Sequence, residues 1–119
     1  VMTTREKALA AVHAAAATGA LTVAALPIGL DAIALRGEEI AAIALIGSFY
    51  GAKLSKATAS GLMASGFAQM VGEKAALASL EASHATGFGA YVIKAGIATA
   101  LIEAVGRCAA DYFEEAAAA

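Results

Sequence analysis

Lys94 is the clearest candidate for a functional polar contact, because it is the one charged residue between positions 82 and 102. At about 100° per residue it projects onto the apolar stripe of a helix, together with Val105 and Tyr112. A buried ammonium without a partner is costly, so one hypothesis is a buried ion pair with an acid of another helix. The candidate acids are Asp31, Glu38 and Glu39. The sequence favours the alternative, in which the flexible lysine stem carries the ammonium past its neighbours into water.

The other residues of catalytic or metal-binding type form no recognisable constellation. His13 and His84 have no Cys, Asp or Glu at metal-ligand spacing, which predicts exposed or hydrogen-bonded histidines. Glu38 and Glu39 are adjacent and point about 100° apart on a helix, so they do not suit a shared substrate. The lone Cys108 excludes an intramolecular disulfide, fits a reducing compartment and is expected to be a small buried hydrophobe. We therefore expect no catalytic residue, no metal and no cofactor.

The elements that position these residues are predicted to be helices arranged around the segment 30–51. Its second half, from Ile40 onward, carries no charge until Lys53. A helix that is apolar all round lies inside a bundle, in an oligomer interface or against lipid. From Ile40 onward we expect this helix to have no solvent-facing side, and we expect it to be enclosed by the first and third helices.

The remaining segments are also typical of helices. Thr3 and Glu6 have the spacing of a capping box and begin a helix that runs to Pro27. Ser55 is a good N-cap for a third helix. Gly72 either separates it from a further helix within 73–83 or is tolerated in one longer helix through that segment. The last helix is expected from about 88 or 90 to 115. Small residues at close spacing let helix backbones approach. The candidate helix-packing residues of this kind are Ala16, Ala20, Ala24, Gly47, Gly51, Ser60, Ala64 and Ala68.

This pattern predicts a single domain over residues 1–119, an all-α bundle of four or five antiparallel helices rich in Ala and Gly contacts. Hydrophobic residues make up 61% and charged residues 15% of the chain, and mean hydropathy is +0.75. Ordinary soluble domains carry about 25% charged residues. The lysines and arginines form no basic patch, which argues against a nucleic-acid partner. The apolar surplus predicts a non-enzymatic interaction or scaffold module that self-associates as a homo-oligomer or docks on a membrane surface.

The sequence leaves two other functions open. The first is an integral membrane protein with two or three short hydrophobic helices, drawn from 8–30, 40–53 and 82–102. Lys94 opposes it, since a charge at mid-span costs about 2.5 to 3.5 kcal/mol on insertion scales. The second is an enzyme or ligand carrier with a cavity lined by Tyr50, Tyr91 and His84, for which the sequence contains no motif.

A set of loose motifs over residues 20–115 also suggests a family. They are Pro27-x-x-x-Asp31, a long apolar helix ending at Tyr50-Gly51, then Leu54-Ser55, and a last helix with Thr99, Gly106 and Tyr112-Phe113-Glu114. This pattern resembles the bacterial helical domain of unknown function that follows small GTP-binding domains in YcjF-like proteins. The resemblance implies a cytoplasmic module at the inner face of the membrane, membrane-associated or self-associating, without catalytic residues and with a GTPase partner. The chain departs from the pattern in that its 119 residues hold no GTP-binding domain, and in having Gly29-Leu30 where many relatives show a Pro-Gly turn.

Overall fold

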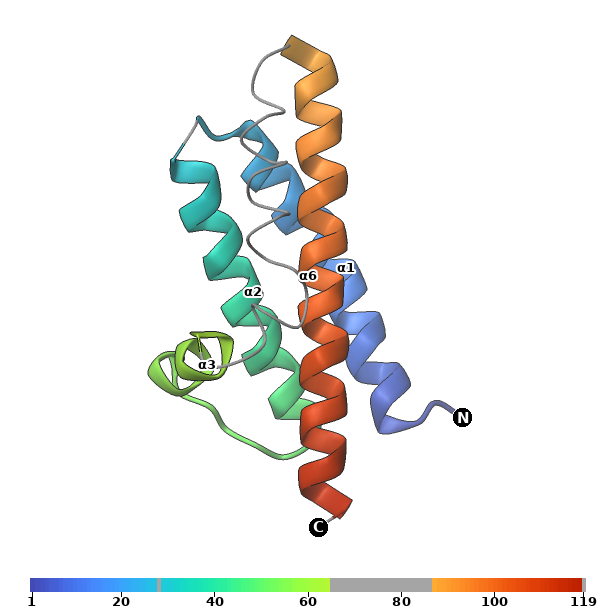
Figure 1. Ribbon diagram of the computed structural model, residues 1–119. Helices are drawn as coiled ribbons and strands as arrows, with labels where there is room; N and C mark the ends of the chain where they lie inside the picture. The colour runs from blue at the N-terminus through green and yellow to red at the C-terminus, as the bar shows by residue number, and fades with distance from the viewer. Residues whose placement is uncertain (28, 65–86, 119) are drawn as a thin grey trace.

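The computed structural model describes residues 1–27, 29–64 and 87–118, and this part of the chain is helical without strands (Figure 1). The helices are α1 (Thr4–Ala25), α2 (Leu30–Phe49), α3 (Lys56–Leu62) and α6 (Gly87–Ala118). The predicted all-α bundle is therefore confirmed. The end of the predicted third helix and the helix predicted within 73–83 lie outside the described residues.

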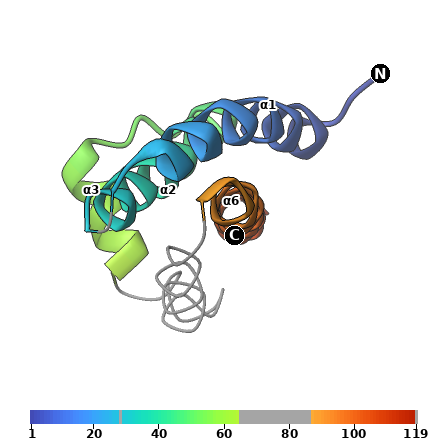
Figure 2. The same ribbon diagram turned by 90° about the horizontal axis from the view of Figure 1, so that it is seen from above.

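The helices α1, α2 and α6 pack on one another, and the short α3 lies against α2 (Figures 1 and 2). The chain ascends through α1 and descends through both α2 and α6. Thus α1 is antiparallel to both of its neighbours, whereas α2 and α6 run in the same direction. Contacts at both ends of α2 and α6 confirm that the two helices are parallel. Asp31 contacts Lys94 near the N-termini of the two helices, and Tyr50 stacks on Phe113 near their C-termini.

Helix α1 begins where the sequence predicts. The Thr3 side chain accepts a hydrogen bond from the Glu6 amide, and the Glu6 carboxylate accepts one from the Thr3 amide. These hydrogen bonds with Thr3 lower the pKa of Glu6. By length and composition, α1 is the one described helix that could cross a membrane. About 39% of its most apolar window is buried within the bundle, and a core helix of a soluble protein meets the same criteria.

Small residues allow these helices to approach closely. Ala16, Ala20 and Ala24 lie on the buried face of α1. A Cβ added at Gly47 would lie 3.2 Å from side-chain carbons of both Leu54 and Phe113. Helices α1 and α6 also approach closely at Gly106, which is not among the predicted packing residues: an added Cβ there would lie 2.8 Å from Cγ1 of Val12.

The packing role predicted for Gly51 and Ala64 is wrong. Gly51 is exposed, an added Cβ would meet nothing within 4 Å, and its φ of +81° marks it as the left-handed residue after α2. Ala64 is exposed as well, because the buried face of α3 runs through Ala59 and Met63, one position before the predicted stripe. Ser60 is half-buried, and Ala68 lies outside the described residues.

The prediction that α2 has no solvent-facing side from Ile40 onward is also wrong, since Ala41, Ser48 and Phe49 are exposed. One stripe of α2 is buried, and it consists of Asp31, Leu35, Glu39, Ala42, Ile43, Ile46 and Gly47. The opposite stripe is exposed at Ile33, Gly37 and Ala41, with Ile33 at 70% exposure. The first half of α2 therefore turns two of its three acids, Asp31 and Glu39, inward and an isoleucine outward. Hydropathy alone assigns these residues to the opposite sides.

Candidate functional site

Lys94 forms a buried ion pair at the end of the bundle where α1 stops and α2 and α6 start. Its Nζ lies 3.1 Å from Oδ2 of Asp31, and the two side chains are 5% and 1% exposed. The alternative in which Lys94 extends into water is therefore wrong. The ammonium reaches inward because Lys94 lies on the buried stripe of α6, with Ala98, Leu101 and Val105 following at helical spacing.

The local structure holds Asp31 in position for this contact. Asp31 occupies the first turn of α2, where the helix dipole favours a carboxylate. Its Oδ1 accepts a hydrogen bond of 2.7 Å from the amide of Ala32, which leaves Oδ2 to face Lys94. Gly29, with φ of +93°, lets the chain turn sharply into the helix just before this residue.

The same ammonium also binds the end of α1. Lys94 Nζ donates a 2.8 Å hydrogen bond to the backbone carbonyl of Leu26, the C-cap residue of α1. Carbonyls at a helix C-terminus lack intrahelical partners and carry partial negative charge, so a cation is favourable there. One side chain of α6 therefore joins the last residue of α1 to the first turn of α2.

The other two candidate acids lie about two turns further along α2 and have different surroundings. Glu38 packs on α1, where a Cβ added at Gly19 would lie 2.6 Å from its Oε2. Glu39 is fully buried, and Nε of Arg36 lies 3.9 Å from its Oε1. Of the predicted set, the structure thus places Asp31 against Lys94 and puts Glu38 and Glu39 at other helix contacts.

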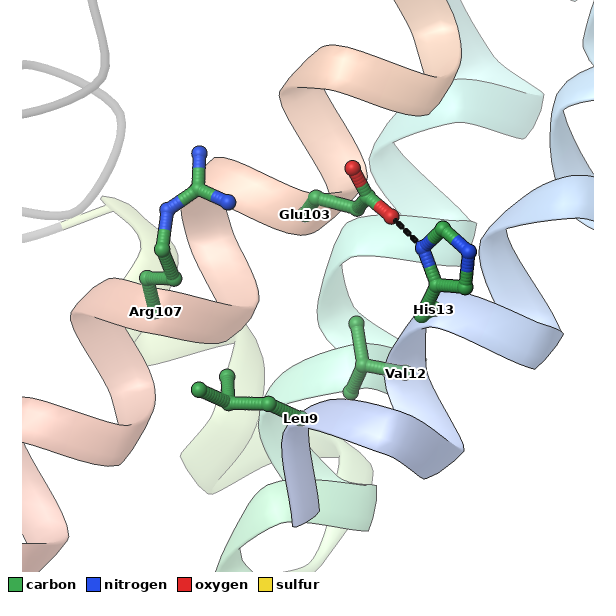
Figure 3. Close-up of a pocket in the computed structure, with 5 residues that line it drawn as sticks. All are labelled: Leu9, Val12, His13, Glu103 and Arg107. Carbon is green, nitrogen blue, oxygen red and sulfur yellow. Dashed lines mark hydrogen bonds and ion pairs between the residues drawn. The ribbon is translucent and has the colours of Figure 1, made fainter. Parts of the chain in front are cut away.

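A shallow groove of about 270 Å³ lies on the seam between α1 and α6 (Figure 3). Leu9, Val12 and His13 of α1 line it together with Glu103 and Arg107 of α6. Nδ1 of His13 and the Glu103 carboxylate share a hydrogen bond across the seam, and their side chains point toward each other. The sequence reasoning predicts a hydrogen-bonded or exposed His13 but gives no sign of this partner, which is 90 residues away.

The bundle's opposite end carries charged and aromatic contacts. Arg5 binds Asp111 at 2.6 Å and Glu114 at 3.0 Å, and these carboxylates raise the pKa of Arg5. The Tyr50 and Phe113 rings stack nearby with centroids 6.3 Å apart. Tyr91 lies about six turns earlier on α6 than Phe113, about 33 Å away at 1.5 Å per residue. The proposed cavity lined by Tyr50 and Tyr91 is therefore wrong, and His84 lies outside the described residues.

Comparisons with protein-family models, with curated proteins and with solved structures find no match for this chain. The resemblance to YcjF-like proteins therefore stays a prediction.

One end of the described bundle has little charge and a group of exposed apolar side chains, whereas the opposite end has both exposed ion pairs and exposed apolar side chains such as Met2 and Phe49. We call the end where α1 stops and α2 and α6 start the apolar end. Five large hydrophobic side chains, each 51% to 70% exposed, lie there: Leu21, Leu30, Ile33, Val92 and Ile93. The stretches 14–35 and 87–102 contain no formal charge except Asp31 and Lys94. At the apolar end, these two buried residues thus neutralise each other, and apolar side chains face outward.

Proposed function

We propose that this chain is a non-enzymatic helical module that docks on a membrane surface through its apolar end. The observation that carries the proposal is the group of five exposed large hydrophobic side chains at this end, where the two charges are buried against each other. Contiguous exposed apolar surface on a small domain marks a site of interaction with protein or membrane. A lipid surface suits this end because three helices, α1, α2 and α6, present apolar side chains around it.

The depth of the uncharged outer surface fits docking at the boundary between headgroups and acyl chains. Leu30 and Arg36 are six residues apart on α2, about 9 Å at 1.5 Å per residue. Amphipathic elements that lie on membranes bury their apolar face by about 5–10 Å. With Leu30 and Ile33 in the acyl region, the 38% exposed side chain of Arg36 lies at the level of the phosphates.

Self-association is the second candidate, and it has its own support. Ile33, Gly37 and Ala41 form the exposed stripe of α2, and an added Cβ at Gly37 would meet nothing within 4 Å. Small residues on an exposed helix face allow a second helix to approach closely. An integral membrane protein is less well supported, since α1 alone among the described helices has the required length and composition and it packs in the bundle.

The test is flotation of the purified chain with phosphatidylcholine vesicles. The variant Ile33→Thr/Val92→Thr/Ile93→Thr changes three exposed side chains at the apolar end. Moving each half-exposed side chain into lipid contributes about 1 kcal/mol, so the variant should bind about a hundredfold more weakly than the wild type. The matched control, Met2→Thr/Phe49→Thr, removes exposed apolar side chains at the opposite end and should float as the wild type does.

Three outcomes would contradict membrane docking. One is wild-type protein that stays with the soluble fraction, and another is equal flotation of the two variants. The third is a wild-type oligomer that ignores vesicles and becomes monomeric in the triple variant, which would establish self-association instead. Protein that floats but resists extraction by alkaline carbonate would instead be integral.

The location and a protein partner follow from the resemblance alone. We propose the inner face of a bacterial membrane as the docking surface and a GTPase as the partner. The lone Cys108 supports a reducing compartment. Copurification of a GTPase with the tagged chain from membranes of the source cell would test the partner independently of vesicle binding.

A further inference from the structure

We propose that Lys94 is a latch that holds the turn between α1 and α2 against α6, and that the apolar end docks with the latch closed. The second part rests on the proposed membrane docking. The first part rests on geometry alone, since one ammonium binds Leu26 O at 2.8 Å and Asp31 Oδ2 at 3.1 Å. It therefore connects both sides of the turn to a third helix.

The contact of Lys94 does more than neutralise the charge of Asp31, because it also binds the end of α1. An ion pair alone requires Lys94 and Asp31, whereas the hydrogen bond to Leu26 adds the end of α1 to the same contact. Hydrogen bonds to charged groups are stronger than neutral ones. Local backbone contacts also hold the turn, such as Leu26 N to Val23 O at 3.2 Å and Ile33 N to Gly29 O at 3.4 Å. The latch adds a long-range contact from this turn to a third helix.

Docking and latch closure are linked through the surroundings of the pair. Contact with lipid removes water from the apolar end and lowers the local dielectric, which strengthens the attraction between Lys94 and Asp31. An open latch would instead bring a lone ammonium and a lone carboxylate toward the acyl region, which is strongly unfavourable. The membrane therefore favours the closed latch, and by reciprocity the closed latch favours binding.

The test is hydrogen exchange of the full chain in buffer and with phosphatidylcholine vesicles. The amides of Leu26 and Ile33 report the closure of the turn, because their acceptors are backbone carbonyls that the substitutions do not alter. The variant Asp31→Asn/Lys94→Met removes both charges, and such replacement of a buried pair usually preserves folding. The control Lys53→Met removes an exposed lysine at the opposite end.

We expect both amides to exchange about tenfold faster in the double variant than in the wild type, which corresponds to about 1.4 kcal/mol. Exchange in the control should be unchanged. Vesicles should slow exchange of these amides in the wild type, and they should slow it less in the double variant, which lacks the ion pair that lipid strengthens.

Wild-type exchange rates at Leu26 and Ile33 in the double variant would overturn the latch, whatever the vesicles show. Equal slowing of exchange by vesicles in the wild type and the double variant would overturn the coupling to docking. If the wild type binds no vesicles, the proposed function fails, while the comparison of exchange rates in buffer still decides whether Lys94 holds the turn.

Discussion

Lys94 shows how far single residues could be interpreted from the sequence. Its isolation in an uncharged stretch and its place on an apolar stripe correctly indicate that a buried Lys94 needs a partner of opposite charge. The sequence favours exposure because snorkelling is the common solution for lysine. It also leaves three acids of α2 open, since the choice depends on the register of α2 against α6. The hydrogen bond from Lys94 to the Leu26 carbonyl could not be predicted, because every residue type has a backbone carbonyl.

Cys108 provides a test at the level of one side chain. Burial raises the pKa of its thiol, nearby Asp111 raises it further and Arg107 partly offsets this. A raised pKa lowers the thiolate fraction at pH 8, and the thiolate is the species that reacts. We expect iodoacetamide to alkylate the folded protein several-fold more slowly than the urea-unfolded protein, as measured by mass spectrometry.

A matched variant separates this effect from general protection by the fold. In Cys108→Ser/Ser48→Cys the thiol moves to an exposed position of α2, where it should react at nearly the same rate in folded and unfolded protein. Equal alkylation rates of Cys108 in the folded and unfolded protein would contradict the conclusion that the fold suppresses its reactivity.

At the scale of elements, the starts of helices were the most predictable feature. The Thr3 capping box and the Ser55 N-cap both begin helices as expected, because these signals are local. The solvent-facing stripe of α2 was not predictable. Its exposed side carries Ile33, Gly37 and Ala41 and its buried side carries Asp31 and Glu39, so hydropathy gives the wrong side. Which side is buried is decided by the neighbouring helices.

Gly106 offers a test of helix packing. The alanine methyl of Gly106→Ala would lie 2.8 Å from Cγ1 of Val12, in the contact between α1 and α6. Overpacking of this kind costs about 1 to 3 kcal/mol, so the free energy of unfolding in urea should fall by that amount. The control Gly96→Ala lies in the same helix with nothing within 4 Å. It should raise stability by about 0.5 to 1 kcal/mol through helix propensity.

A second substitution shows whether Val12 is the cause. Val12→Ala in the Gly106→Ala background should recover part of the lost stability, because the shorter side chain makes room for the added methyl. Loss of stability in Gly96→Ala as large as in Gly106→Ala would contradict packing as the explanation.

At the scale of the whole molecule, the group of exposed apolar side chains at the weakly charged end of the described bundle is the feature that connects the fold with the proposed function. Composition shows a surplus of apolar residues but not where on the surface they lie. They lie together because the end of α1 meets the starts of α2 and α6 (Figure 1). Uncharged stretches at 14–35 and 87–102 are visible in the sequence. That they form one end follows from the parallel course of α2 and α6, which no local pattern predicts.

The most direct test of docking through this end uses single tryptophans, since the chain has none of its own. Ile93→Trp places the reporter at the apolar end, and Phe49→Trp places it at the opposite end of the bundle. With vesicles of brominated phosphatidylcholine, we expect the emission of the residue-93 reporter to shift to the blue and to be quenched, while that of the residue-49 reporter stays unchanged. Quenching of the residue-49 reporter alone, or of neither, would contradict the account.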